Sequence, residues 1–139
     1  MAPEKRVRTV LVIDDESSVR KMAKVRLESE GYRVLTATQG EMGLAMARVE
    51  HPDVILLDVL MPNMDGREVL RQLQADDTTR GIPVVLLSVI DPADSMSEPI
   101  GPGVAFHVPK PFETADLLKK LRLALAGVRH EPGGSATHA

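Results

Sequence analysis

The feature that most constrains the fold of this chain is a set of short, largely apolar segments rich in branched residues. They are VRTVLVI at residues 7–13, DVILL at 53–57 and PVVLL at 83–87. Strands that are apolar along their whole length are typical of parallel sheets covered by helices on both faces, whereas antiparallel strands usually alternate apolar and polar residues. The chain is therefore predicted to be an α/β protein built on a parallel sheet.

Between these segments the apolar residues change to helical spacing. Val19, Met22, Ala23 and Leu27 share one helical face, and Gly31 ends that pattern. Further helices are predicted at 41–49, 67–75 and 113–126, and shorter strands at 33–37 and 104–108. Strands that alternate with helices form βαβ units, which supports the parallel sheet.

The length of 139 residues corresponds to one ordinary domain. We expect it to cover residues 7–126, with a flank at 1–6 and a mobile C-terminal tail at 127–139. The net charge of −3 and the scattered basic residues argue against direct binding of nucleic acid. The chain has no cysteine and no apolar run near the ~20 residues that span a bilayer. Its first residues lead at once into a strand-like run, so we expect no signal peptide. We therefore expect a soluble cytoplasmic protein that does not bind membranes.

Polar residues stand at the ends of four predicted strands. They are Asp14 and Asp15, Asp58, Ser88 and Lys110. The carboxyl ends of parallel strands meet at one edge of the sheet, where such folds bind their ligands. Three carboxylates without a cation would repel one another and raise one another's pKa. A divalent metal and Lys110 would relieve this repulsion, and a site with only oxygen ligands suits Mg²⁺.

This combination is suited to phosphoryl transfer. A metal and a lysine can neutralise the phosphoryl oxygens, and an aspartate can attack to form an aspartyl phosphate. Each residue alone has an ordinary structural explanation: Asp14 and Asp15 could cap a helix, and Asp58 could belong to a turn. Their joint occurrence at separate strand ends favours a functional acidic site.

Four segments of the sequence, taken in order, resemble the receiver domains of two-component response regulators, of the chemotaxis-regulator type. The segments are VLVIDDE at 10–16, PDVILLDVLMPNMDG at 52–66, PVVLLS at 83–88 and PKPF at 109–112. The resemblance implies a flavodoxin-like, doubly wound sheet of five parallel strands in the order 2-1-3-4-5, with helices on both faces. It also implies a signalling domain, not an enzyme.

The resemblance further implies specific roles at the acidic site. Asp58 would be the phosphoacceptor, with a histidine kinase or a histidine phosphotransfer protein as donor. Asp15, Asp58 and the backbone carbonyl of Leu60 would bind Mg²⁺ directly, and Asp14 would act through a coordinated water. The phosphorylated domain would then bind an output protein, which the sequence does not identify.

The remaining implied roles belong to the switch. Lys110 would pair with the phosphoryl group, and Ser88 would close onto it as the switch hydroxyl. The Lys110–Pro111 peptide bond would be cis. His107 stands where relatives carry the aromatic residue that swings inward, so it is the expected switch position on the fifth strand.

The segment between Ser88 and Lys110 departs from the family pattern. It contains DPADSMSEPIGPG at 91–103, and an interior proline costs a helix roughly 3 kcal/mol. The fourth helix of the family is therefore expected to be short, displaced or replaced by a loop. In relatives, polar side chains at the positions of Leu60 and Ile90 can orient the water that attacks the aspartyl phosphate. The apolar residues of this chain therefore predict slow self-dephosphorylation.

Two alternatives stay open at this stage. A phosphorylation-independent interaction module would fit the proline-rich segment and His107, but not the complete acidic site. A phosphatase that forms an aspartyl phosphate would need a second aspartate two residues after the nucleophile, where this chain has Leu60. The sequence also leaves open whether the domain stands alone or belongs to a longer protein.

Overall fold

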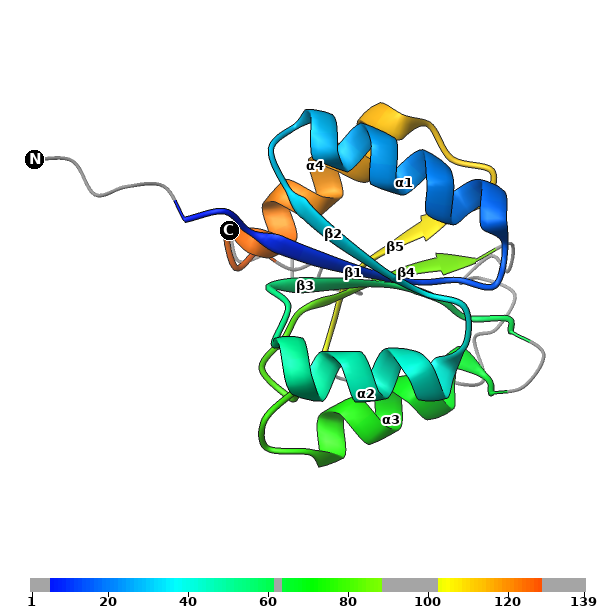
Figure 1. The fold of residues 1–139 in the computed structure, drawn as a ribbon, viewed down its shortest axis with the longest axis vertical. Coiled ribbons are helices and arrows are strands. Elements are labelled where there is room, and N and C mark those ends of the chain that lie inside the picture. The colour runs from blue at the N-terminus through cyan, green and yellow to red at the C-terminus, as the bar shows by residue number, and fades with distance from the viewer. Residues whose placement is uncertain (1–5, 62–63, 89–102, 129–139) are drawn as a thin grey trace, which may run out of the picture.

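The structure is a computed structural model that describes residues 6–61, 64–88 and 103–128. Within these residues, five parallel strands form one sheet in the order β2-β1-β3-β4-β5 (Figure 1). The strands are β1 (Thr9–Ile13), β2 (Arg33–Ala37), β3 (Val54–Asp58), β4 (Val84–Ser88) and β5 (Val104–Pro109). The predicted fold class and strand order are confirmed.

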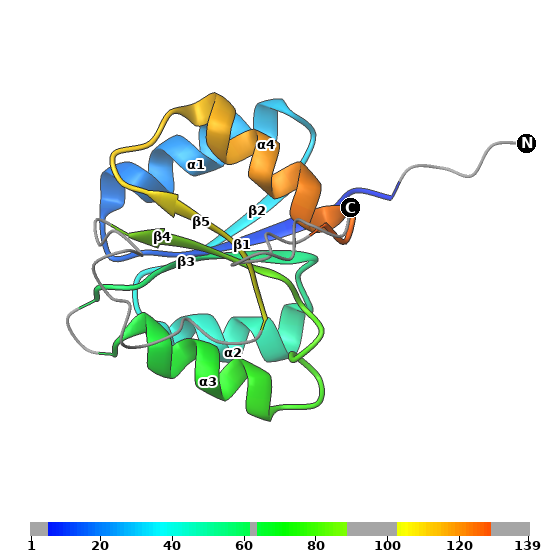
Figure 2. The same cartoon turned by 180° about the vertical axis from the view of Figure 1, so that it is seen from behind.

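Helices cover both faces of this sheet. α1 (Ser17–Ser29) and α4 (Thr114–Leu125) lie on one face, and α2 (Gly40–Glu50) and α3 (Gly66–Ala75) lie on the other (Figures 1 and 2). The boundaries agree closely with the predicted ranges, although β1 begins at Thr9 instead of residue 7. Arg6 binds Asp53 by a salt bridge just before that strand.

Each face of the sheet has its own apolar core. Val10 and Val12 of β1 pack toward α1 and α4, whereas Leu11 and Ile13 pack toward α2 and α3. This alternation follows from the two-residue period of a strand. All five residues of β1, β3 and β4 are buried, which is why their sequences are almost continuously apolar.

The strand order reverses beside β1, because β1 pairs with both β2 and β3. The register pairs Ile13 of β1 with Leu57 of β3. The next residues, Asp14 and Asp58, therefore lie side by side at the carboxyl edge of the sheet. This is the topological switch point at which α/β sheets commonly bind ligands.

Some predictions fall outside the described residues. The segment expected to contain a shortened or missing fourth helix lies almost entirely within residues 89–102, so that prediction stays open. The helix labelled α4 here is the one predicted at 113–126. Most of the expected tail also lies beyond the described part. None of the helices in the described ranges is long and apolar enough to cross a membrane.

Candidate functional site

Three carboxylates gather at the carboxyl edge of the sheet. Asp14 and Asp15 follow β1, and Asp58 ends β3. One carboxylate oxygen from each lies within 4.8 Å of those of the other two. Asp14 and Asp58 are buried, whereas Asp15 is exposed. We call these three residues the acidic cluster.

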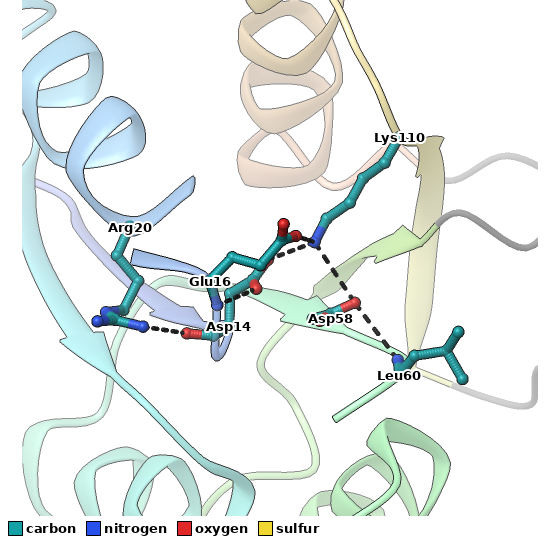
Figure 3. Close-up of polar contacts among 6 residues, drawn as sticks. All are labelled: Asp14, Glu16, Arg20, Asp58, Leu60 and Lys110. Carbon is teal, nitrogen blue, oxygen red and sulfur yellow. Dashed lines mark hydrogen bonds and ion pairs between the residues drawn. The ribbon is translucent and has the colours of Figure 1, made fainter. Parts of the chain in front are cut away.

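Lys110 reaches the acidic cluster from the end of β5 (Figure 3). Its Nζ lies 2.8 Å from Asp14 Oδ2, 2.6 Å from Glu16 Oε1 and 3.6 Å from Asp58 Oδ1. Only 9% of the lysine side chain is exposed. Its backbone N–H donates to the carbonyl of Ser88 at 2.7 Å, and the following Lys110–Pro111 peptide bond is cis. The expected cis bond is therefore present.

The backbone around Asp14 is fixed by several hydrogen bonds. Its N–H donates to the carbonyl of Ala37 at 3.1 Å, and its own carbonyl accepts from the Arg20 guanidinium at 2.9 Å. Its carboxylate accepts from the N–H of Glu16 at 2.9 Å, while the other oxygen faces Lys110. Asp14 is thus held between the sheet and the start of α1.

Asp58 is held by the loop that follows β3. The N–H of Leu60 donates to Asp58 Oδ1 at 3.3 Å, and the N–H of Val59 donates to the carbonyl of Leu87 at 3.0 Å. Gly66 closes the loop by donating to the carbonyl of Val59 at 2.7 Å. A Cβ on Gly66 would lie 2.6 Å from Val59 Cα, closer than real Cβ atoms come. The loop therefore requires glycine here.

The acidic cluster perturbs the protonation of Asp58. Burial and the neighbouring charge of Asp14 raise the pKa of Asp58 to about 7, although Lys110 and the Leu60 N–H act in the opposite direction. For Lys110, burial lowers the pKa, but the hydrogen bonds to Asp14 and Glu16 outweigh this and hold it above its ordinary value. The repulsion expected among the carboxylates is therefore only partly relieved by Lys110.

The donor set fits Mg²⁺. Three carboxylates converge on one point, one of them is exposed, and no nitrogen or sulfur ligand lies among them. Mg²⁺ prefers oxygen ligands and keeps several waters, so it can bind at such an edge without a closed protein cage. A bound cation would also offset the charge repulsion that raises the pKa of Asp58.

The two predicted switch residues lie on the neighbouring strands. Ser88 is the last residue of β4, is 1% exposed, and pairs with Pro109 of β5. His107 is half-buried on β5, and its carbonyl accepts from Lys120 of α4 at 3.3 Å. Phe106 packs against the core on the α1 and α4 side, so the adjacent His107 faces the other way.

Two residues at the site were not identified from the sequence. Glu16 contributes the shortest contact to Lys110, and Arg20 binds the Asp14 carbonyl. The only sequence signal for Glu16 is its position directly after the aspartate pair. Its partner is 94 residues away in the chain, so the contact appears only once β1 and β5 are placed.

Comparison with known proteins agrees with this architecture. Residues 10–122 match the family model described as the response regulator receiver domain. The chain is 40% identical over 113 residues to the response regulator PleD of Caulobacter vibrioides, covering 81% of this chain and 25% of that protein. It is 35% identical over 118 residues to the protein PilH of Pseudomonas aeruginosa, covering 85% of this chain and 98% of that protein.

Solved structures give the same result. The chemotaxis protein CheY4 of Vibrio cholerae superposes with a TM-score of 0.75 at 32% identity, over 84% of this chain and 98% of that chain. The chain spans a quarter of PleD and 49% of TcrX of Mycobacterium tuberculosis, described as a probable transcriptional regulatory protein. The matched region thus occurs both within longer proteins and nearly alone.

Proposed function

Because the chain belongs to the response regulator receiver domain family and is a phosphoacceptor domain of two-component signalling, we propose that Asp58 is the residue that accepts the phosphoryl group. The observation that carries this proposal is the convergence on Asp58 of Lys110 and two further carboxylates from separate strand ends. In the described ranges the cluster contains two further aspartates, but Asp14 is already held by Lys110 and the Glu16 N–H, and Asp15 is exposed. Asp58 therefore has beside it both a cation and two carboxylates that could hold a metal with it.

In the proposed reaction, a carboxylate oxygen of Asp58 attacks the phosphorus of a phosphohistidine. A P–O bond forms, the P–N bond breaks, and the electron pair returns to the imidazole nitrogen of the donor. The Leu60 N–H at 3.3 Å helps to orient the attacking carboxylate. The raised pKa of Asp58 means that neighbouring positive charge increases the fraction of the reactive, ionised form.

Mg²⁺ would be held by Asp15, Asp58 and the backbone carbonyl of Leu60, with Asp14 acting through a coordinated water. When bound, Mg²⁺ supplies positive charge that stabilises the phosphoryl oxygens in the transition state. Lys110 supplies a second positive charge from the end of β5. Its buried stem limits the positions that this ammonium can reach.

Ser88 and His107 are proposed to carry the signal away from the site. Ser88 is buried at the end of β4, the strand beside β3 that carries Asp58, and its backbone carbonyl accepts from the N–H of Lys110. Closure of Ser88 onto the phosphoryl group would change the β4–β5 edge, and His107 would respond on β5. This deepens the proposal and depends on phosphorylation of Asp58.

The partners follow from the same proposal. The donor is a histidine kinase or a histidine phosphotransfer protein, and the phosphorylated surface binds an output protein without direct contact to nucleic acid or membrane. The chain acts in the cytoplasm as a signalling domain and not as an enzyme. We propose residues 7–126 as the receiver unit, with residues 127–139 outside it.

The test is phosphorylation by acetyl phosphate and Mg²⁺, followed by intact mass. The wild type should gain one phosphoryl group, and Asp58→Asn should gain none. Asp77→Asn is the matched control, because Asp77 is a highly exposed aspartate outside the acidic cluster and should leave the gain unchanged. If the wild type fails with both this donor and a phosphorylated kinase domain, the proposal is wrong.

A further inference from the structure

Lys110 is held mainly by the loop after β1 and only loosely by Asp58. An ammonium has three N–H donors. Two of them reach Glu16 and Asp14, at 2.6 Å and 2.8 Å, whereas the 3.6 Å to Asp58 is too long for a hydrogen bond. In this unphosphorylated arrangement, the lysine is therefore directed toward the β1–α1 loop (Figure 3).

Glu16 is placed so that its side chain can hold the Lys110 ammonium near the loop after β1. Glu16 is the N-cap residue of α1, but its side chain makes no capping hydrogen bond. Its backbone is fixed, since its N–H donates to Asp14 Oδ1 and its carbonyl accepts from the N–H of Arg20. The side chain is 54% exposed and yet turns to Lys110, so it can return to solvent without leaving a buried charge.

The two carboxylates that hold Lys110 therefore differ in burial and in their ability to move away. Asp14 is fully buried and belongs to the acidic cluster, so it cannot leave the site. Glu16 is outside that cluster and contacts the lysine from the solvent side. An ion pair with an exposed partner contributes little free energy, so a new anion on Asp58 can displace it.

We propose that Glu16 is a positioning residue that holds the Lys110 ammonium away from Asp58 until a phosphoryl group on Asp58 displaces it. This inference rests on the proposed function, because it assumes that Asp58 is the phosphoacceptor. The contact stabilises only the unphosphorylated form, in which Lys110 has no phosphoryl oxygen to bind. Glu16 therefore disfavours phosphorylation of Asp58, because Lys110 must give up its contact with Glu16 before it can bind the phosphoryl group.

The first test is the concentration of acetyl phosphate that half-phosphorylates the protein at fixed Mg²⁺, measured by intact mass. Glu16→Gln keeps the shape of the side chain and removes its charge, so this concentration should fall about two- to fivefold, as expected for loss of one exposed ion pair. Glu16→Asp keeps the charge but is one methylene shorter, so it should behave like Glu16→Gln. The control is Glu41→Gln, which removes an exposed first-turn glutamate of α2 at the same edge of the sheet.

The second test does not require phosphorylation. In protein with ¹⁵N-labelled lysine, the ammonium signal of Lys110 should become more mobile in Glu16→Gln and Glu16→Asp, but not in Glu41→Gln. Assignment follows from loss of that signal in Lys110→Arg. A purely structural role of Glu16 in capping α1 would leave this signal unchanged.

The outcomes separate the two proposals. Absence of a mass gain in the wild type with both acetyl phosphate and a phosphorylated kinase domain would overturn the proposed function and the role of Glu16 with it. A normal gain with an unchanged half-maximal donor concentration in Glu16→Gln would overturn the role of Glu16 alone. An equal change in Glu41→Gln, or wild-type behaviour of Glu16→Asp, would assign the effect to general charge and also overturn it.

Discussion

Lys110 lies closer to Glu16 than to Asp58, with Nζ 2.6 Å from Glu16 Oε1 and 3.6 Å from Asp58 Oδ1. The Lys110 ammonium, which is expected to bind the phosphoryl group, is thus held by Glu16 and Asp14 before phosphorylation. Asp58 is left with a raised pKa and two carboxylate neighbours. Part of the repulsion among the carboxylates therefore remains in the unphosphorylated site, and several measurable properties follow from it.

The stability of the metal-free protein should fall as the pH rises from about 4 to about 7. The pKa of the Asp58 carboxyl rises from its ordinary value of 3.8 to about 7 in the folded protein. Between these values the unfolded chain has lost the Asp58 proton whereas the folded chain keeps it, so the free energy of unfolding decreases with pH. A shift of this size corresponds to about 4 kcal/mol. Above pH 7 both states are ionised and the effect is constant.

Urea unfolding in the presence of a chelator, at pH 5 and pH 8, measures this effect. Asp58→Asn lacks the titrating group and should lose less stability over the same interval. Asp76 does not interfere, because hydrogen bonds from Thr78 lower the pKa of its carboxyl, and its contribution is lost only as the pH falls below this window. Equal pH dependence in the wild type and Asp58→Asn would contradict the account.

Mg²⁺ should stabilise the folded protein at pH 8, because it binds the assembled acidic cluster and not the unfolded chain. At a concentration one hundred times its Kd, the gain is about 2.7 kcal/mol. Asp15→Asn should remove most of this gain while changing the metal-free stability little, since Asp15 is exposed. Thermal unfolding with and without Mg²⁺ measures both quantities. A gain that survives in Asp15→Asn would place the metal elsewhere.

Removal of the lysine charge should destabilise the metal-free protein at pH 8. Lys110→Met leaves the buried Asp14 carboxylate without its cation, and loss of one partner of a buried pair typically costs about 3–5 kcal/mol. Mg²⁺ should restore part of this stability. Lys119→Met on the exposed side of α4 is the control. Urea unfolding that shows equal stabilities for both variants would mean that Lys110 does not neutralise the cluster.

The loop that holds Asp58 should not tolerate a side chain at Gly66. Gly66→Ala would place a methyl group against Val59 Cα and the Asp58 carbonyl, so we expect a loss of about 1–3 kcal/mol and slower phosphorylation. Gly81→Ala is the control, because a Cβ there meets nothing within 4 Å. The free energy of unfolding and the phosphorylation rate are the two readouts. A variant as stable and active as the control would show that the loop adapts freely.

Local sequence patterns were sufficient to predict the sheet, the helices on both faces and the residues at the strand ends. The apolar strands and the helical spacing of residues such as Leu27 are properties of neighbouring residues, and parallel pairing then brings Asp14 and Asp58 together. The contact of Glu16 with Lys110 is different in kind. It depends on where two side chains point that are 94 residues apart in the sequence, and no local pattern specifies that.

The pKa of Asp58 illustrates the same distinction. Repulsion among three carboxylates is predictable from their positions after the strands, but the dominant cause is burial of Asp58, which is 4% exposed. Burial at a strand end depends on the neighbouring segments of the folded chain, and here the hydrogen bond from Gly66 to Val59 fixes the backbone after β3. The sequence predicted the charges of the site more completely than their surroundings.

The most direct test of the central claim locates the acyl phosphate in the chain. After phosphorylation by acetyl phosphate and Mg²⁺, borohydride reduces an aspartyl phosphate to homoserine, and peptide mass spectrometry then identifies the altered residue. We expect homoserine at position 58 alone, and none in Asp58→Asn. Homoserine at Asp14 or Asp15, or its persistence in Asp58→Asn, would contradict the assignment of Asp58 as the phosphoacceptor.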